Sequence, residues 1–211
     1  MAKFSKGEAI RFGWNTMKSN LGFFIPLLLV VLLVVWLIPL VPVLLSYLLA
    51  KEKPLLSSGV NLICSILGTI VELGMIKIFL NFCDNLKSKI SDLFSQYRLF
   101  FRYFFASILS GLITLFGMIL LIIPGIYLGI RFQFFGYFIV DKKAGVIESL
   151  KRSWRITKGN AWNLFLFGLL LGAINLLGVL CLVMGLFATI PTTEAAFAFV
   201  YRKLLAKTET V

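Results

Sequence analysis

Histidine is absent from this chain of 211 residues, and its three cysteines, Cys64, Cys83 and Cys181, are widely spaced. Without histidine, the chain lacks the commonest metal ligand and the usual general base at neutral pH. Three cysteines at these spacings fit neither a disulfide framework nor a metal knuckle, so we interpret them as small apolar residues. We therefore expect no metal, no cofactor and no enzymatic activity of the hydrolase or zinc-enzyme kind.

Acidic residues are scarce as well: the chain has 9 Asp and Glu residues and 21 Lys and Arg residues. Such an excess of positive charge is typical of proteins that bind nucleic acid or an anionic membrane surface. Hydrophobic residues make up 60% of the chain, and its mean hydropathy is +0.97. Soluble domains are about 45–50% apolar. The composition therefore predicts an integral membrane protein with anionic lipids as partners and no nucleic acid.

Charge is missing altogether from residues 21–50, a run that exceeds the length of about 20 helical residues needed to cross a bilayer. Further apolar runs extend over residues 55–82, 103–123, 126–140 and 161–200. The last run is long enough for two spans joined near Gly185, which brings the predicted number of spans to six. Pro124 and Gly125 separate the third run from the fourth and predict a hairpin with almost no loop.

The distribution of Lys and Arg predicts the orientation of these spans. Six spans place almost all basic residues outside the spans on one side: Lys3, Lys6, Arg11, Lys18, Lys87, Lys89, Arg98, Arg102, Lys142, Lys143, Lys151, Arg152, Arg155, Lys158, Arg202, Lys203 and Lys207. Only Lys51 and Lys53 lie on the other side. Because Lys and Arg concentrate in cytoplasmic loops, we expect a multi-pass protein with both termini in the cytoplasm.

The chain also contains an internal repeat. Residues 8–20 and 148–160 align so that Glu8, Trp14, Lys18 and Asn20 meet Glu148, Trp154, Lys158 and Asn160. A weaker match pairs Gly117 with Gly178 and Pro124 with Gly185. Apolar residues recur at helical spacing in the basic segments near residues 10–21, 90–101 and 147–154, while Lys and Arg fill the other faces.

These patterns predict an all-α fold: six transmembrane helices with three amphipathic helices on the cytoplasmic side. We expect a single integral membrane domain over residues 1–211, with repeat units at about 4–83, 84–140 and 141–205. Each unit is an amphipathic helix followed by a two-span hairpin. The alternative is that the basic segments are solvated loops whose charges only set the orientation.

Three motifs carry a resemblance to a known family: GEAIRFGW at residues 7–14, IPGIYL at 123–128 and ESLKRSWRITKG at 148–159. The chain resembles a broad bacterial family that includes YciC-like inner-membrane proteins and the membrane domain attached to some glycerophosphoryl diester phosphodiesterases. The resemblance covers nearly the whole chain and is most specific over residues 124–160. It implies six helices in the bacterial cytoplasmic (inner) membrane. It does not imply phosphodiesterase activity, which belongs to a separate soluble barrel in the fused proteins.

Four ionisable residues, Glu72, Lys77, Arg131 and Glu194, fall within the predicted spans. Charge inside a membrane is costly, so these residues form a candidate polar site. We predict that Glu194 pairs with Arg131 or Lys77, because an unpaired buried charge is expensive. The nearby residues Thr189, Pro191, Thr192 and Thr193 indicate either a binding cavity or threonines that repair a broken helix.

Small residues in the spans are expected to let helices approach closely rather than to bind a ligand. The glycines concerned are Gly111, Gly117, Gly168, Gly172 and Gly178.

Three functions follow from these patterns. The leading hypothesis is a noncatalytic membrane organiser, anchor or accessory subunit that engages anionic lipid headgroups through Arg11, Lys18, Lys151, Arg152, Arg155 and Lys158. The alternative is a small transporter or channel, a homo-oligomer or a complex with another membrane protein, that uses Glu72, Arg131 and Glu194. An intramembrane lipid enzyme ranks last, because no pattern in the sequence places Glu72 and Glu194 together as an acid pair.

Overall fold

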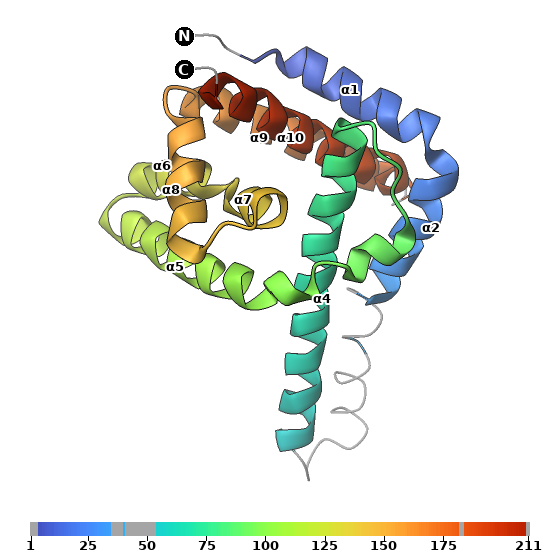
Figure 1. Cartoon of the computed structure of the whole chain (residues 1–211), viewed down its shortest axis with the longest axis horizontal. Helices are drawn as coiled ribbons and strands as arrows, with labels where there is room; N and C mark the ends of the chain where they lie inside the picture. The colour runs from blue at the N-terminus through green and yellow to red at the C-terminus, as the bar shows by residue number, and fades with distance from the viewer. Residues whose placement is uncertain (1–3, 35–39, 41–53, 182–183, 210–211) are drawn as a thin grey trace.

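The structure, a computed structural model, describes residues 4–34, 40, 54–181 and 184–209. The described residues form helices and no strand, so the all-α prediction is confirmed for this part of the chain (Figure 1). In chain order they are α1 (Lys6–Ser19), α2 (Leu21–Leu32), α4 (Pro54–Cys83), the 3₁₀ helices η2 (Ile90–Phe94) and η3 (Tyr97–Leu99), α5 (Phe100–Leu120), α6 (Ile122–Phe132), α7 (Phe135–Lys142), α8 (Val146–Thr157), α9 (Ala161–Leu180) and α10 (Leu186–Glu209).

Four helical segments among the described residues are long and apolar enough to cross a membrane: Ser58–Cys83, Ile90–Leu120, Ile122–Lys142 and Ala161–Leu180. Helices α1 and α2 add a fifth if they form one broken span, since they meet at Asn20 with a bend of 93°. Half of the predicted first span, residues 21–50, lies outside the described residues. Several such helices are what a multi-pass membrane protein requires.

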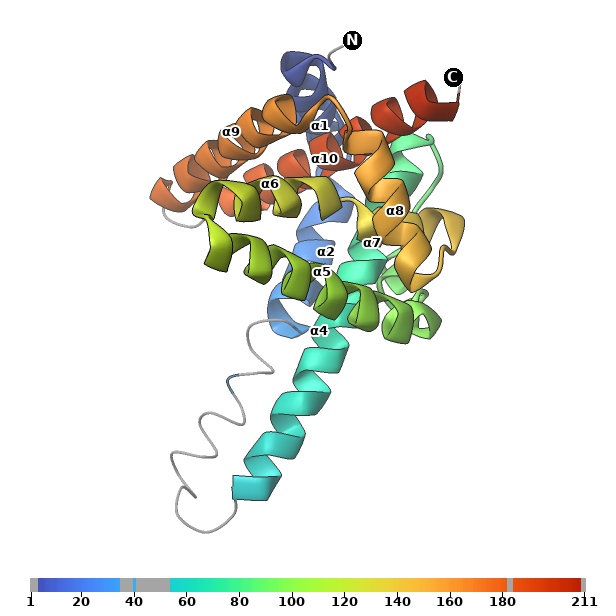
Figure 2. The ribbon, with the colours of Figure 1, turned by 90° about the vertical axis from the view of Figure 1, so that its left-hand side faces the viewer.

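Helices α5 and α6 form an antiparallel hairpin that extends toward the same side as α9 (Figure 2). The chain turns at Leu121, which is extended, so the predicted break at Pro124 and Gly125 is wrong by three residues. Pro124 falls in the first turn of α6, where a missing N–H loses no helical hydrogen bond. A Cβ on Gly125 would lie 2.7 Å from the backbone nitrogen of Met118, so this glycine lets the two helices touch.

The second hairpin joins α9 to α10 and confirms the predicted tight connection near Gly185. A Cβ on Gly185 would lie 2.6 Å from the carbonyl oxygen of Gly178. The prediction of close packing therefore holds for Gly178, and also for Gly117, which faces Gly125 across the first hairpin. It is wrong for the remaining three, because a Cβ would meet nothing within 4 Å at Gly111, Gly168 or Gly172.

The middle amphipathic helix predicted near residues 90–101 is wrong. This segment forms η2 and η3, and α5 begins only at Phe100. Asp92 accepts a hydrogen bond from the backbone nitrogen of Lys89 at 2.8 Å, and the Ser95 hydroxyl donates to the Asp92 carbonyl at 2.8 Å. Such local bonds from Ser and Asp compete with the α-helix and favour tight turns.

Helix α10 lies at the centre of the packing, in contact with α1, α2, α4, α8 and α9. Helix α1 runs beside it (Figure 1), and a Cβ on Gly13 would lie only 2.1 Å from the carbonyl oxygen of Thr192. The rings of Phe12 and Phe199 stack at 4.7 Å, and Tyr201 is completely buried. The predicted amphipathic helix α1 is therefore confirmed as a helix, with one face packed on protein.

Candidate functional site: an acidic cavity among the helices

A cavity of about 800 Å³ opens among α2, α4, α5, α7, α9 and α10. Apolar and aromatic side chains alternate around it with hydroxyl, amide and carboxyl groups. Its lining comprises Val31, Ser65, Gly68, Thr69, Val71, Glu72, Met75, Ile76, Tyr103, Gln133, Phe135, Gly136, Tyr137, Gly168, Leu171, Asn175, Ile190, Thr193, Glu194 and Phe197.

Helix α4 contributes a polar stripe to this cavity. Ser65, Thr69 and Glu72 recur at spacings of four and three residues, which places them on one helical face. The hydroxyls of Ser65 and Thr69 donate to the carbonyls of Asn61 and Ser65 at 3.0 and 2.9 Å. Glu72 is exposed, and the Tyr103 hydroxyl of α5 donates a hydrogen bond to its Oε1. The carboxylate of Glu72 is therefore held at the cavity wall.

Helix α10 supplies the second carboxylate, Glu194, which lies close enough to Glu72 for the two charges to interact. Thr193 precedes it and exchanges a weak hydrogen bond with Asn175 of α9, at 3.3–3.4 Å. Thr192 donates to the carbonyl of Ala188 at 2.7 Å, and Thr193 donates to that of Ile190 at 3.0 Å. The two threonines thus bond to backbone carbonyls close to Pro191, and Thr193 also lines the cavity.

A break between α6 and α7 brings Gln133, Phe135 and Tyr137 into the lining. The break leaves backbone groups without helical partners, and α8 supplies them. Ser153 donates to the carbonyl of Arg131 at 2.8 Å and accepts from the backbone nitrogen of Phe134 at 3.1 Å. Such repair lets irregular backbone persist inside a membrane protein. The amide Nε2 of Gln133 is buried and has no hydrogen-bond partner among the described residues.

The lining contains two carboxyl groups and no Lys or Arg among the described residues. A cavity of this kind attracts cations and repels anions. No group of three His, Cys, Asp or Glu that could hold a metal ion occurs in the described part of the chain.

Comparison with known proteins assigns the chain to a family. A sequence profile described as a domain of unknown function, DUF7847, matches residues 98–210, more than half of the chain. The chain belongs to the DUF7847 family. No curated protein and no solved structure matches it. The DUF7847 region contains Glu194 and Gln133 but not Glu72, so the cavity is built partly from the segment that precedes it. The resemblance to YciC-like proteins stays a prediction.

The other two predicted intramembrane residues of this DUF7847 chain lie outside the cavity lining. The predicted ion pair of Glu194 with Arg131 or Lys77 is wrong, since no ion pair joins these residues in the described part of the chain. Arg131 is 2% exposed, and its guanidinium lies 4.1 Å from the centre of the Trp154 ring and 5.6 Å from that of Tyr127. Aromatic faces replace the expected carboxylate as its partners.

Lys77 is half-buried and lies close enough to Lys143 for their two positive charges to interact. Burial, followed by the charges of Lys77 and Arg102, lowers the pKa of Lys143 at the end of α7. Lys143 in turn donates to Gln96 at 2.7 Å. Lys77 therefore takes no part in the acidic cavity.

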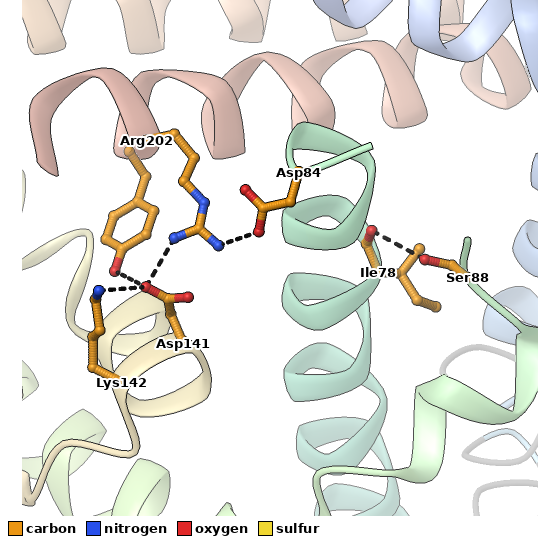
Figure 3. Close-up of polar contacts among 7 residues, drawn as sticks. Ile78, Asp84, Ser88, Asp141, Lys142 and Arg202 are labelled. Atoms are coloured by element: carbon orange, nitrogen blue, oxygen red, sulfur yellow. Dashed lines mark hydrogen bonds and ion pairs between the residues drawn. The ribbon is translucent and has the colours of Figure 1, made fainter. Parts of the chain in front are cut away.

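A polar network around Arg202 joins α10 to α7 and to the segment just after α4 (Figure 3). Arg202 Nη1 lies 2.9 Å from Asp141 Oδ2 of α7, and Nη2 lies 2.6 Å from Asp84 Oδ2 just after α4. The Tyr201 hydroxyl also donates to Asp141, at 3.0 Å. Burial opposes the charge of Arg202, but the bonds and charges of Asp141 and Asp84 prevail and raise its pKa. Three elements of the cavity wall thus meet at one guanidinium. This network was not predicted from the sequence.

The predicted headgroup-binding residues lie on the outer faces of α1 and α8. Arg11, Lys18, Lys151, Arg155 and Lys158 are exposed. Arg152 is half-buried and pairs with Glu148 at 2.5 Å, so its charge is already compensated. Trp14 and Trp154 accompany them at 49% and 37% exposure.

Proposed function

We propose that the chain is a small membrane transporter or channel that admits cations to the cavity containing Glu72 and Glu194. The observation that carries this proposal is that both carboxylates line one cavity whose described lining has no basic residue. Ionisable groups inside a membrane are expensive and mark ion or substrate pathways. Two negative charges in a site of low dielectric constant repel each other, and a bound cation or proton relieves that repulsion.

The topology proposed with this function has six spans and both termini in the cytoplasm, and its first and third repeat units begin with an amphipathic helix. In support, α1 and α8 each carry a glutamate in the first turn, Glu8 or Glu148. Asn20 and Asn160 then stand as N-caps of the next helices, α2 and α9. In this arrangement the Arg202 network lies on the cytoplasmic side of the protein.

A flux measurement tests the transport proposal. The full chain is reconstituted in liposomes, and uptake of rubidium, choline and chloride is followed against protein-free liposomes. Uptake of at least one cation without chloride supports the proposal, and Glu194→Gln should reduce it about tenfold. Glu148→Gln, an exposed glutamate on α8, is the matched control and should leave uptake unchanged. Chloride uptake, or no uptake above the protein-free level, contradicts the proposal.

A second candidate function is the engagement of anionic lipid headgroups, as a noncatalytic organiser, anchor or accessory subunit. The observation that favours it is the exposure of Arg11, Lys18, Lys151, Arg155 and Lys158 beside exposed tryptophans. Basic charges near a membrane surface attract anionic lipids, and tryptophan prefers the interface. Native mass spectrometry from lipid nanodiscs tests it, because retained anionic lipid should be lost on neutralising Lys151 and Arg155. Retention of zwitterionic and anionic lipid alike would exclude this function.

We also propose that the chain is related to the bacterial inner-membrane family that includes YciC-like proteins. The three sequence motifs support this proposal. The motif at residues 148–159 forms most of α8, whose Ser153 and Thr157 both donate to the Arg131 carbonyl. The motif at 123–128 forms the start of α6. The two motifs would thus maintain the break that brings Gln133 to the cavity, and the inner membrane would be the location of the protein.

A further inference from the structure

The volume of the cavity and the side chains that line it limit the class of ligand that can bind there. At about 800 Å³ it falls in the range of small-molecule sites, roughly 300–1,000 Å³, and far exceeds the space a single metal ion needs. Inorganic cations require several oxygen ligands that converge on one point. Among the described residues, no group of three His, Cys, Asp or Glu side chains provides this.

Aromatic rings form much of the remaining wall. Tyr103 and Phe135 lie with their ring centres 5.2 Å apart, and those of Tyr137 and Phe197 are 5.8 Å apart. The faces of such rings attract organic ammonium groups, and aliphatic side chains such as Met75 and Leu171 add apolar surface. Carboxylates and aromatic rings together suit a ligand with a positively charged head group and an apolar body.

The side chain of Gln133 indicates that the ligand also carries a hydrogen-bond acceptor. Its Nε2 is buried, lacks a hydrogen-bond partner among the described residues, and belongs to a side chain in the cavity lining. Because this nitrogen is closed off from the open cavity, the Gln133 side chain must turn for it to meet a ligand. An oxygen atom on the ligand then recovers the roughly 1–3 kcal/mol that a buried donor without an acceptor costs.

We propose that the ligand of this cavity is an organic ammonium ion that carries an apolar body and an oxygen acceptor. Its positive head lies between Glu72 and Glu194, its body contacts the rings of Tyr103 and Phe197, and its oxygen accepts from Gln133. This inference rests on the proposed cation transport and adds the chemical class of the cation.

Calorimetric titration of the purified full chain tests the inference. Dodecyl maltoside is the detergent, because its headgroup is uncharged and cannot compete. The probes are choline, its neutral analogue 3,3-dimethylbutan-1-ol, tetramethylammonium, potassium and sodium. Choline should bind at least about tenfold more tightly than potassium or sodium, tetramethylammonium more weakly than choline, and the neutral analogue not at all.

Substitutions test whether choline binds to the side chains proposed to contact it. Glu72→Gln and Glu194→Gln, which keep side-chain shape, should each weaken choline binding about tenfold, and Glu148→Gln should not. Gln133→Leu should remove the preference for choline over tetramethylammonium. Elution of each variant as a single species in size-exclusion chromatography shows that it is folded.

The outcomes separate this inference from the proposed function. Potassium or sodium binding as tightly as choline, with the same dependence on Glu194, overturns the organic ligand and leaves cation transport standing. Binding of the neutral analogue as tightly as choline also overturns it. Absence of binding by every cation contradicts both proposals.

Discussion

The guanidinium of Arg131 lies 4.1 Å from the centre of the Trp154 ring, so a charge in a candidate span rests on an aromatic face of α8. Desolvated contacts of this kind contribute about 2 kcal/mol. Trp154→Ala should therefore lower the thermal unfolding temperature of the detergent-solubilised protein. The matched control is Trp162→Ala, because Trp162 is 69% exposed and stacks on the nearby Phe165 ring. Equal shifts in the two variants would show that the contact with Arg131 contributes nothing.

The Arg202 network makes a second prediction about stability. Arg202→Gln leaves Asp84 and Asp141 without their shared cation, although Tyr201 still bonds to Asp141. Because these groups are only partly buried, we expect a loss of about 1–2 kcal/mol. Thermal unfolding measures it, with Arg98→Gln as the control, since Arg98 is exposed and bonds to the adjacent Tyr97. An unfolding temperature equal to that of the control variant would contradict the network's role.

Close packing of α1 on α10 predicts opposite effects for two glycines of one helix. A Cβ on Gly13 would lie 2.1 Å from the Thr192 carbonyl oxygen, whereas a Cβ on Gly7 would meet nothing within 4 Å. Gly13→Ala should displace α1 and cost about 1–3 kcal/mol. Gly7→Ala should be neutral or stabilise by up to about 1 kcal/mol, because alanine favours helix. Limited proteolysis of the N-terminal segment reports the displacement, and unchanged protection in Gly13→Ala would refute it.

The pair of Glu148 and Arg152 predicts a pH dependence. The hydrogen bond from Arg152, then a backbone bond and the Arg152 charge, lower the pKa of Glu148 below its ordinary 4.5. Since the folded form holds the proton less tightly, the stabilising contribution is complete above pH 4.5 and is lost as the pH falls through the lowered pKa. The difference in unfolding temperature between the wild type and Glu148→Gln should shrink in acid. It should be smaller in an Arg152→Gln background, where only the backbone bond still lowers the pKa of Glu148.

Long apolar segments were predictable because crossing a bilayer demands them whatever the tertiary structure. The α4 span and the α9–α10 connection were thus placed correctly. The spacing of Ser65, Thr69 and Glu72 was a readable signal of a polar face, which the sequence analysis missed. The meeting of Glu72 with Glu194 could not be predicted, because it depends on how α4 and α10 are rotated and packed.

The partner of Arg131 was missed for a related reason. Charge complementarity favours a carboxylate, but the ring that meets this guanidinium belongs to Trp154, on the helix that repairs the α6–α7 break. The turns at residues 90–99 depend on bonds from Asp92 and Ser95, which outweigh the helical spacing of apolar residues there.

Cysteine labelling tests most directly whether the cavity is open to cations. Thr69→Cys, one helical turn from Glu72, is introduced after Cys64, Cys83 and Cys181 are replaced by serine. Its rates with trimethylammonium-ethyl and sulfonato-ethyl methanethiosulfonate are then compared, each relative to a free thiol. We predict about tenfold faster labelling by the cationic reagent, and loss of that preference in Glu72→Gln/Glu194→Gln. Labelling without charge preference, or faster labelling by the anion, would contradict the acidic cavity as a cation site.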